Sequence, residues 1–197
     1  MKTSLNAVLF AVAAVGLSAC SSTPSTDSAP SASTATTTTG TAAVSTAKAA
    51  VVNLASASGS LVSGRLSVVP MNDGVHLTGE VGGLSPGSTH AIHIHEKGDC
   101  SAADASSAGG HFNPAGAPHG KVGSGAHHGG DMDNIVANAE GVAKVDVHAS
   151  GVTLGGAAVN DVAGKAVIVH AAADDYRTQP TGNAGGRVAC GVITVTQ

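Results

Sequence analysis

Residues 61–81 read LVSGRLSVVPMNDGVHLTGEV, two runs of β-favouring residues with a short polar interruption between them. The interruption, Asn72-Asp73-Gly74, is typical of a tight turn that joins two antiparallel strands. After it, every second residue is small or apolar, as in a strand with one buried face: Val75, Leu77, Gly79 and Val81. We therefore predict a β-hairpin whose apolar face lies in a core.

The rest of the chain after residue 50 repeats this pattern of short apolar runs bounded by Gly, Pro and Asn. No long amphipathic helical pattern accompanies them, so we predict an all-β sandwich or barrel. The expected strands are 51–55, 61–69, 75–81, 90–95, 142–147, 166–170 and 188–195. Two long stretches without strand patterns interrupt them, 96–141 and 171–187, and loops of that length in a compact domain are usually functional.

Composition bounds the function. The formal net charge of −4 offers no basic footprint, which argues against a nucleic-acid partner. The sequence leaves open whether the chain is a monomer or a homodimer.

The N-terminus predicts export. Lys2 precedes a short apolar run, so residues 1–19 are typical of a signal peptide. The run ends in Leu17-Ser18-Ala19-Cys20, which resembles a bacterial lipobox and implies that Cys20 carries lipid; the alternative is an ordinary cleaved signal. Residues 20–49, rich in Ser, Thr, Ala and Pro, predict a disordered tether before a folded domain at 50–197. We expect a periplasm-facing lipoprotein of a bacterial cell envelope, and Ser21 after the Cys favours the outer membrane.

The remaining cysteines, Cys100 and Cys190, form an even pair in an exported domain. We predict a disulfide between them. Two free buried thiols are the alternative.

Histidines supply the chemistry. His93 and His95 lie two apart, so their side chains share one face of the expected strand. Any single histidine is more often a hydrogen-bonded core residue than a ligand. The clustering favours transition-metal binding instead, because strand ends and loops of an all-β fold bring such residues together: His93, His95, His111, His119, His128, Asp131 and His170.

Three segments strengthen this interpretation: AIHIHEKGDC at 91–100, GGHFNP at 109–114 and GNAGGRVACG at 182–191. In this order they resemble the copper/zinc superoxide dismutase family, and the resemblance spans residues 50–197. It implies a Greek-key β-sandwich, or flattened barrel, of about eight antiparallel strands with two long functional loops.

The resemblance also implies residue roles. His93, His95, His111 and His170 would bind copper, and His111, His119, His128 and Asp131 would bind zinc, with His111 shared. His127 could in principle replace His128, although the three-residue step to Asp131 favours His128. Asp174 would link ligand imidazoles of both metals, Arg187 would guide the anionic substrate, and His90 would be structural.

The implied enzyme dismutes superoxide to O2 and hydrogen peroxide by Cu(II)/Cu(I) cycling with one copper and one zinc per chain. His111 would pass a proton to the forming peroxide. The alternative to Arg187 as a catalytic residue is a solvated loop arginine. The alternative function is a non-enzymatic copper-binding or copper-delivery lipoprotein on the same fold, which would be expected to lack a zinc ligand, the shared histidine or the arginine.

Overall fold

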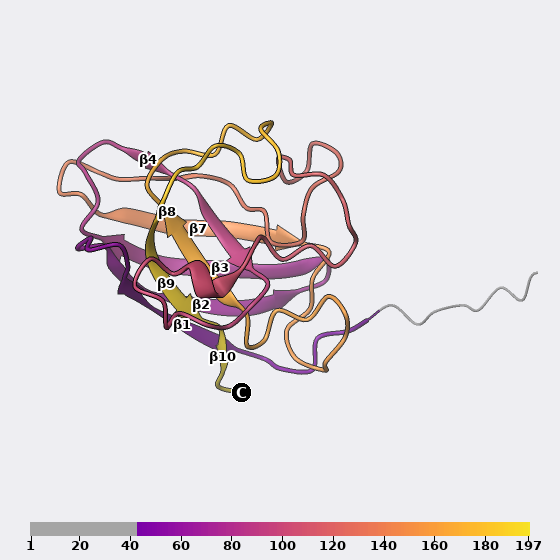
Figure 1. Cartoon of the computed structure of the whole chain (residues 1–197). Helices are drawn as coiled ribbons and strands as arrows, with labels where there is room; N and C mark the ends of the chain where they lie inside the picture. The colour runs from indigo at the N-terminus through magenta and orange to yellow at the C-terminus, as the bar shows by residue number, and fades with distance from the viewer. Residues whose placement is uncertain (1–42) are drawn as a thin grey trace, which may run out of the picture. The chain divides into compact units, whose positions relative to one another are not determined.

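The computed structural model describes residues 43–197, and the signal peptide and Cys20 lie outside these described residues. These residues form ten strands and one 3-10 turn, η1, and Figure 1 labels most of the strands. Their bounds are β1 Ala50–Ser56, β2 Ser63–Met71, β3 Gly74–Gly82, β4 Thr89–His90, β5 Ile92–His95, η1 Ser106–Ala108, β6 Ile135–Val136, β7 Ala143–Ser150, β8 Ala166–His170, β9 Arg187–Val192 and β10 Thr194–Val195. Within residues 43–197 no helix is long and apolar enough to cross a membrane.

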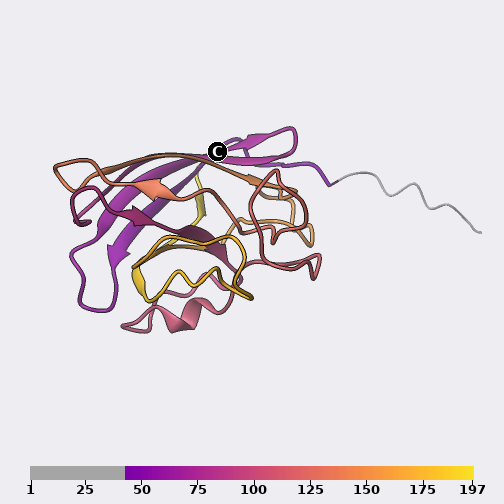
Figure 2. The ribbon, with the colours of Figure 1, turned by 90° about the horizontal axis from the view of Figure 1, so that it is seen from above.

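One curled antiparallel sheet contains most of the strands. Its order is β5-β8-β9-β1-β2-β3-β7, with β10 beside β1, and β4 and β6 form a separate short ladder. β1 connects the two halves, because its first residues pair with β2 and its last two, Ala55 and Ser56, pair with β9. Figures 1 and 2 show the β5-β8-β9 half facing the β1-β2-β3-β7 half across the core. The all-β fold of about eight antiparallel strands is confirmed.

The predicted hairpin is confirmed as β2 and β3. Met71 pairs with Gly74, so Asn72 and Asp73 form a two-residue turn. Val75, Leu77 and Val81 are fully buried, whereas Thr78 and Glu80 on the opposite face are exposed. Gly79 fits this face because its backbone lies against the carbonyl of Arg65, where a Cβ would clash.

β5 and β8 differ from the other strands because every residue in them is buried. Alternate residues of both strands point into the main core, among them Ile92, Ile94 and Val169. The opposite faces carry the ligand histidines and Ile168, and the two long loops cover them. A strand buried on both faces normally reads as continuously apolar. Three histidines at such positions therefore need a specific partner.

Several expected boundaries were wrong. The run 90–95 is two strands, because Ala91 bonds to His170 and Ala172 while β4 pairs with β6. The run 188–195 breaks at Ile193, whose backbone bonds to Lys165 instead. The stretch 96–141 includes η1 and β6. Before residue 50, the backbone N–H groups of Thr46 and Ala47 donate hydrogen bonds to the Leu154 carbonyl.

Candidate metal centre

Two groups of ligand side chains meet at the outer face of β5 and β8. One consists of His93, His95, His111 and His170, and the other of His111, His119, His128 and Asp131. Within each group the ligand atoms lie within 4.8 Å of one another, and every member is buried. His111 belongs to both. The structure thus brings all seven sequence-predicted ligand residues together in two adjoining groups.

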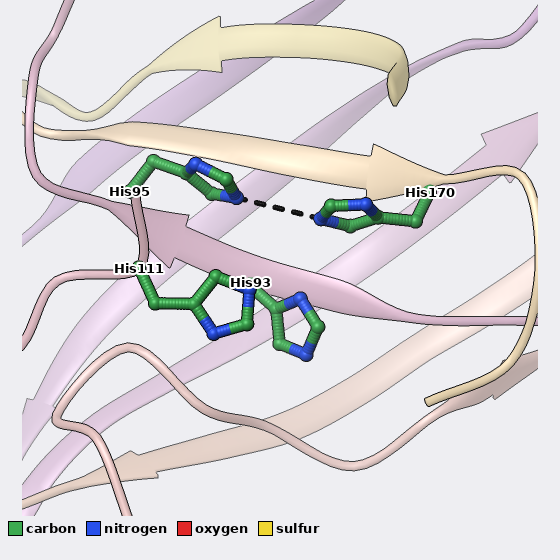
Figure 3. A group of neighbouring side chains, drawn as sticks. All are labelled: His93, His95, His111 and His170. Carbon is green, nitrogen blue, oxygen red and sulfur yellow. Dashed lines mark hydrogen bonds between the residues drawn. The ribbon is translucent and has the colours of Figure 1, made fainter. Parts of the chain in front are cut away.

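The backbone explains how the first group assembles. β5 supplies His93 and His95, and β8, its antiparallel neighbour, ends in His170. His111 pairs with His95 through an isolated β-bridge, so the covering loop is tied to the strand at this point. In Figure 3 the rings of His95 and His170 meet tip to tip, 3.4 Å apart between their Nε2 atoms.

Each imidazole of the first group is oriented through its other ring nitrogen. His95 Nδ1 lies 2.9 Å from the carbonyl of Gly109, and His170 Nδ1 lies 3.3 Å from that of Gly185. His93 bonds through Nε2 to Asp174, at 2.8 Å. Metal-binding histidines usually have such an acceptor behind them. One nitrogen of each ring is then left to face the centre of the group.

Two of these inward nitrogens show directly that the site suits a metal ion. His93 Nδ1 and His111 Nε2 are buried and have no hydrogen-bond partner among residues 43–197. An unsatisfied buried polar atom costs free energy, so such atoms are rare without a function. Four imidazole nitrogens suit copper, and three histidines with one carboxylate form a reasonable closed zinc set.

Burial keeps His93, His95 and His170 in the metal-binding form. Desolvation lowers the pKa of His93 to about 4, of His170 to about 3 and of His95 to about 2. These imidazoles are therefore neutral at neutral pH, which leaves a lone pair on each free nitrogen.

Asp131 is the centre of the second group. Its Oδ1 lies 2.9 Å from His111 Nδ1, 3.0 Å from His119 Nδ1 and 3.4 Å from His128 Nδ1. Its Oδ2 accepts hydrogen bonds from the backbone N–H groups of Gly120 and His128. Burial by itself raises the pKa of this carboxyl, but these hydrogen bonds outweigh it and hold the pKa below its usual range. The group therefore contains a permanent carboxylate.

Asp174 joins the two groups, as the resemblance implies. Its Oδ2 accepts from His93 Nε2 at 2.8 Å, and its Oδ1 lies 2.9 Å from His119 Nε2. Burial raises the pKa of Asp174, and the hydrogen bonds from His93 and His119 outweigh this and lower it. A charged carboxylate thus orients one ligand of each group.

The two neighbouring histidines, His127 and His128, point in different directions. His128 lies in the second group. His127 points away from it, with Nδ1 2.7 Å from the carbonyl of His128 and Nε2 3.0 Å from Ser150 Oγ. His90 is also outside both groups, with Nδ1 2.8 Å from the carbonyl of His170.

Arg187 begins β9 at the edge of the first group. Its guanidinium donates to the carbonyls of Ala105 and Gly109, both at 2.6 Å, so the arginine is held and not freely solvated. Gly109 also accepts from His95, which links the arginine to a ligand of the group. The predicted Cys100–Cys190 disulfide is present and ties the same loop to β9.

Sequence reasoning missed two amide side chains. Asn134 makes two hydrogen bonds to the backbone of Asp174: its Nδ2 donates to the Asp174 carbonyl at 2.9 Å, and its Oδ1 accepts from the Asp174 N–H at 2.9 Å. Gln179 does the same to His119. No spacing rule could have found them, because each acts on main-chain atoms 40 or 60 residues away.

Comparison with known proteins identifies the relatives of this arrangement. Residues 62–193 match the family model described as copper/zinc superoxide dismutase (SODC). The chain is 45% identical over 136 residues to a Cu-Zn superoxide dismutase of Caulobacter vibrioides, which covers 66% of this chain and 78% of the relative. It is 41% identical over 135 residues to Cu-Zn superoxide dismutase 2 of Aquifex aeolicus, with 67% and 79% coverage. A solved SOD-like protein from Bacillus subtilis matches at TM-score 0.66 and 35% identity, over 73% of this chain and 97% of that one.

Proposed function

The chain belongs to the copper/zinc superoxide dismutase family and is a superoxide dismutase, and on this premise we propose which residues perform each role. Copper is held by His93, His95, His111 and His170. Zinc is held by His111, His119, His128 and Asp131. The observation that carries this assignment is the inward-facing, unpartnered nitrogen on both His93 and His111.

Bound copper supplies the redox chemistry, in which one superoxide is oxidised to O2 and a second, with two protons, is reduced to hydrogen peroxide. The chain's own residues bind the anion and deliver a proton. Arg187 carries a permanent positive charge, and its two backbone hydrogen bonds fix it beside the Gly109 carbonyl that orients His95. A fixed guanidinium attracts and orients a small anion.

His111 is the proposed proton carrier. Its Nδ1 faces the second group, 2.9 Å from Asp131, while its Nε2 faces the first and has no hydrogen-bond partner among residues 43–197. Nε2 can take up a proton only while this nitrogen is not bound to copper, and the proton would then point into the first group. The second group would hold the other side of the ring and so keep Nε2 directed there.

Metal analysis of the purified chain beside an activity assay tests these roles. We expect one copper and one zinc per chain and cyanide-sensitive dismutation of superoxide. A metal-replete protein with no activity would instead support the copper-binding or copper-delivery alternative. Loss of copper without loss of zinc on replacing His170 by Ala, and loss of zinc on replacing His128 by Ala, would support the division of ligands.

We also propose that the protein is a lipoprotein anchored through Cys20 and facing the periplasm, at the outer membrane of a bacterium. The short apolar run before Leu17-Ser18-Ala19-Cys20, and Ser21 after it, support this location. Incorporation of labelled palmitate should require Cys20. A Cys20→Ser variant that stays in the membrane fraction would contradict the anchor.

A further inference from the structure

The backbone of His119 depends on a side chain from the other long loop. Gln179 Oε1 accepts a hydrogen bond from the His119 N–H at 2.8 Å, and Gln179 Nε2 donates to the His119 carbonyl at 2.9 Å. A glutamine amide offers one acceptor and one donor group side by side, so it can bind both sides of a single residue. Gln179 thus holds His119 on either side of its Cα atom.

His119 has no other main-chain partner among residues 43–197. Its N–H and carbonyl make no backbone–backbone hydrogen bond, and the residue is 3% exposed. Buried backbone groups need a hydrogen-bond partner. Because no strand or helix passes through this position, the Gln179 amide is what satisfies them.

The side chain of His119 needs a fixed Cα because both ring nitrogens are engaged. Nδ1 lies 3.0 Å from Asp131, in the proposed zinc group, and Nε2 lies 2.9 Å from Asp174. A shift of the backbone would break one of these contacts. Gln179 itself contacts neither carboxylate, nor any ligand atom of either group, in the hydrogen bonds that the described chain makes.

We infer that Gln179 is a positioning residue for zinc: it holds His119 in the geometry that closes the zinc group and so sets the zinc affinity. The inference rests on the proposed assignment of zinc to His111, His119, His128 and Asp131. It makes the loop after β8, which carries Gln179, part of the zinc site, although that loop follows a proposed copper ligand, His170.

The test uses the full chain with Gln179→Met, which keeps the length of the side chain and removes both hydrogen bonds. Gln179→Glu, which removes the donor alone, serves if the Met variant does not fold. Gln197→Met is the matched control, because Gln197 is exposed at the C-terminus. Zinc and copper affinities are measured by competition with chromophoric chelators. Co(II) bound in the zinc group reports its geometry through the visible absorption spectrum.

We expect Gln179→Met to weaken zinc binding about 10- to 100-fold, the usual effect of losing a residue that orients a ligand. Its Co(II) spectrum should change, and its copper affinity should stay within about threefold of the unaltered chain. A variant with lower thermal stability but unchanged zinc affinity and Co(II) spectrum would overturn the inference. Equal loss of copper and zinc affinity would overturn it too, because it would mean that the substitution destabilises both metal groups and not His119 in particular. If the unaltered chain bound no zinc in this group, the proposed function would fail before the variants were compared.

Discussion

Removing the Cys100–Cys190 disulfide should cost much stability and little activity. The bridge joins residues 90 positions apart, linking the loop after β5 to β9. In the chain-entropy model a disulfide that closes a loop of this length stabilises the folded state by roughly 4–5 kcal/mol at 25 °C. We expect the Cys100→Ala/Cys190→Ala variant to lose about this much free energy of unfolding.

The effect on activity is separate, because Arg187 does not depend on the disulfide alone. Its guanidinium makes two hydrogen bonds to the same loop, at Ala105 and Gly109, and hydrogen bonds from a charged group contribute roughly 1.5–3 kcal/mol each. These should keep the loop closed in the folded protein. We therefore expect kcat/KM at 25 °C to stay within about threefold of the unaltered chain.

Urea unfolding of the metal-free protein measures the first quantity, and dismutation by the metal-loaded protein measures the second. Both proteins carry Cys20→Ser, so that neither a lipid anchor nor a free thiol at this position complicates the comparison. A loss of stability below about 1 kcal/mol would refute the loop-closure argument. A collapse of activity in a protein that is still folded and metal-replete would refute the independent docking of Arg187.

Three further perturbations test the site. Arg187→Glu should slow dismutation and reverse the dependence of its rate on ionic strength, because the variant repels the anion. The same charge reversal at the exposed Arg65 on β2 should do neither. Equal effects of the two variants would mean that only the net charge of the protein matters. Gly182→Ala should weaken zinc binding about 10- to 100-fold, since the added Cβ would overlap Asp174 Oδ1. Gly186→Ala, where a Cβ meets open space, is the control. Equal zinc affinities of the two variants in chelator competition would refute this explanation. The metal-free protein should lose stability as the pH falls from about 6.5 towards 4. The pKa values of His93 and His170 are lowered to about 4 and about 3 in the folded protein, so the unfolded chain binds more protons in this pH range. Urea unfolding midpoints that do not change between pH 7.5 and pH 5 would contradict this prediction.

The shared face of His93 and His95 was predictable because their pattern is local. His93 and His95 share a face by the two-residue repeat of a strand, and the structure confirms that face for both. The pairing of cysteines was predictable for a different reason, since two remain in a domain that we expect to be exported once Cys20 is set aside.

The three-residue step to Asp131 favoured His128 over His127, but spacing does not predict where either ring points. Both lie in an irregular loop, where no repeat specifies the direction of a side chain. In the structure Ser150, on β7, lies within hydrogen-bond distance of His127 Nε2, and the His127 ring points away from the second group.

The sequence by itself determined the all-β fold, the hairpin at Asn72 and Asp73 and the residues that can bind metal, because these follow from side-chain period, turn chemistry and ligand type. Only the tertiary structure decided how those ligands are held. The carbonyls of Gly109 and Gly185 and the amides of Asn134 and Gln179 reach main-chain or ring atoms far away in the sequence. Such contacts leave no periodic trace, because they depend on where two irregular loops meet over the same pair of strands.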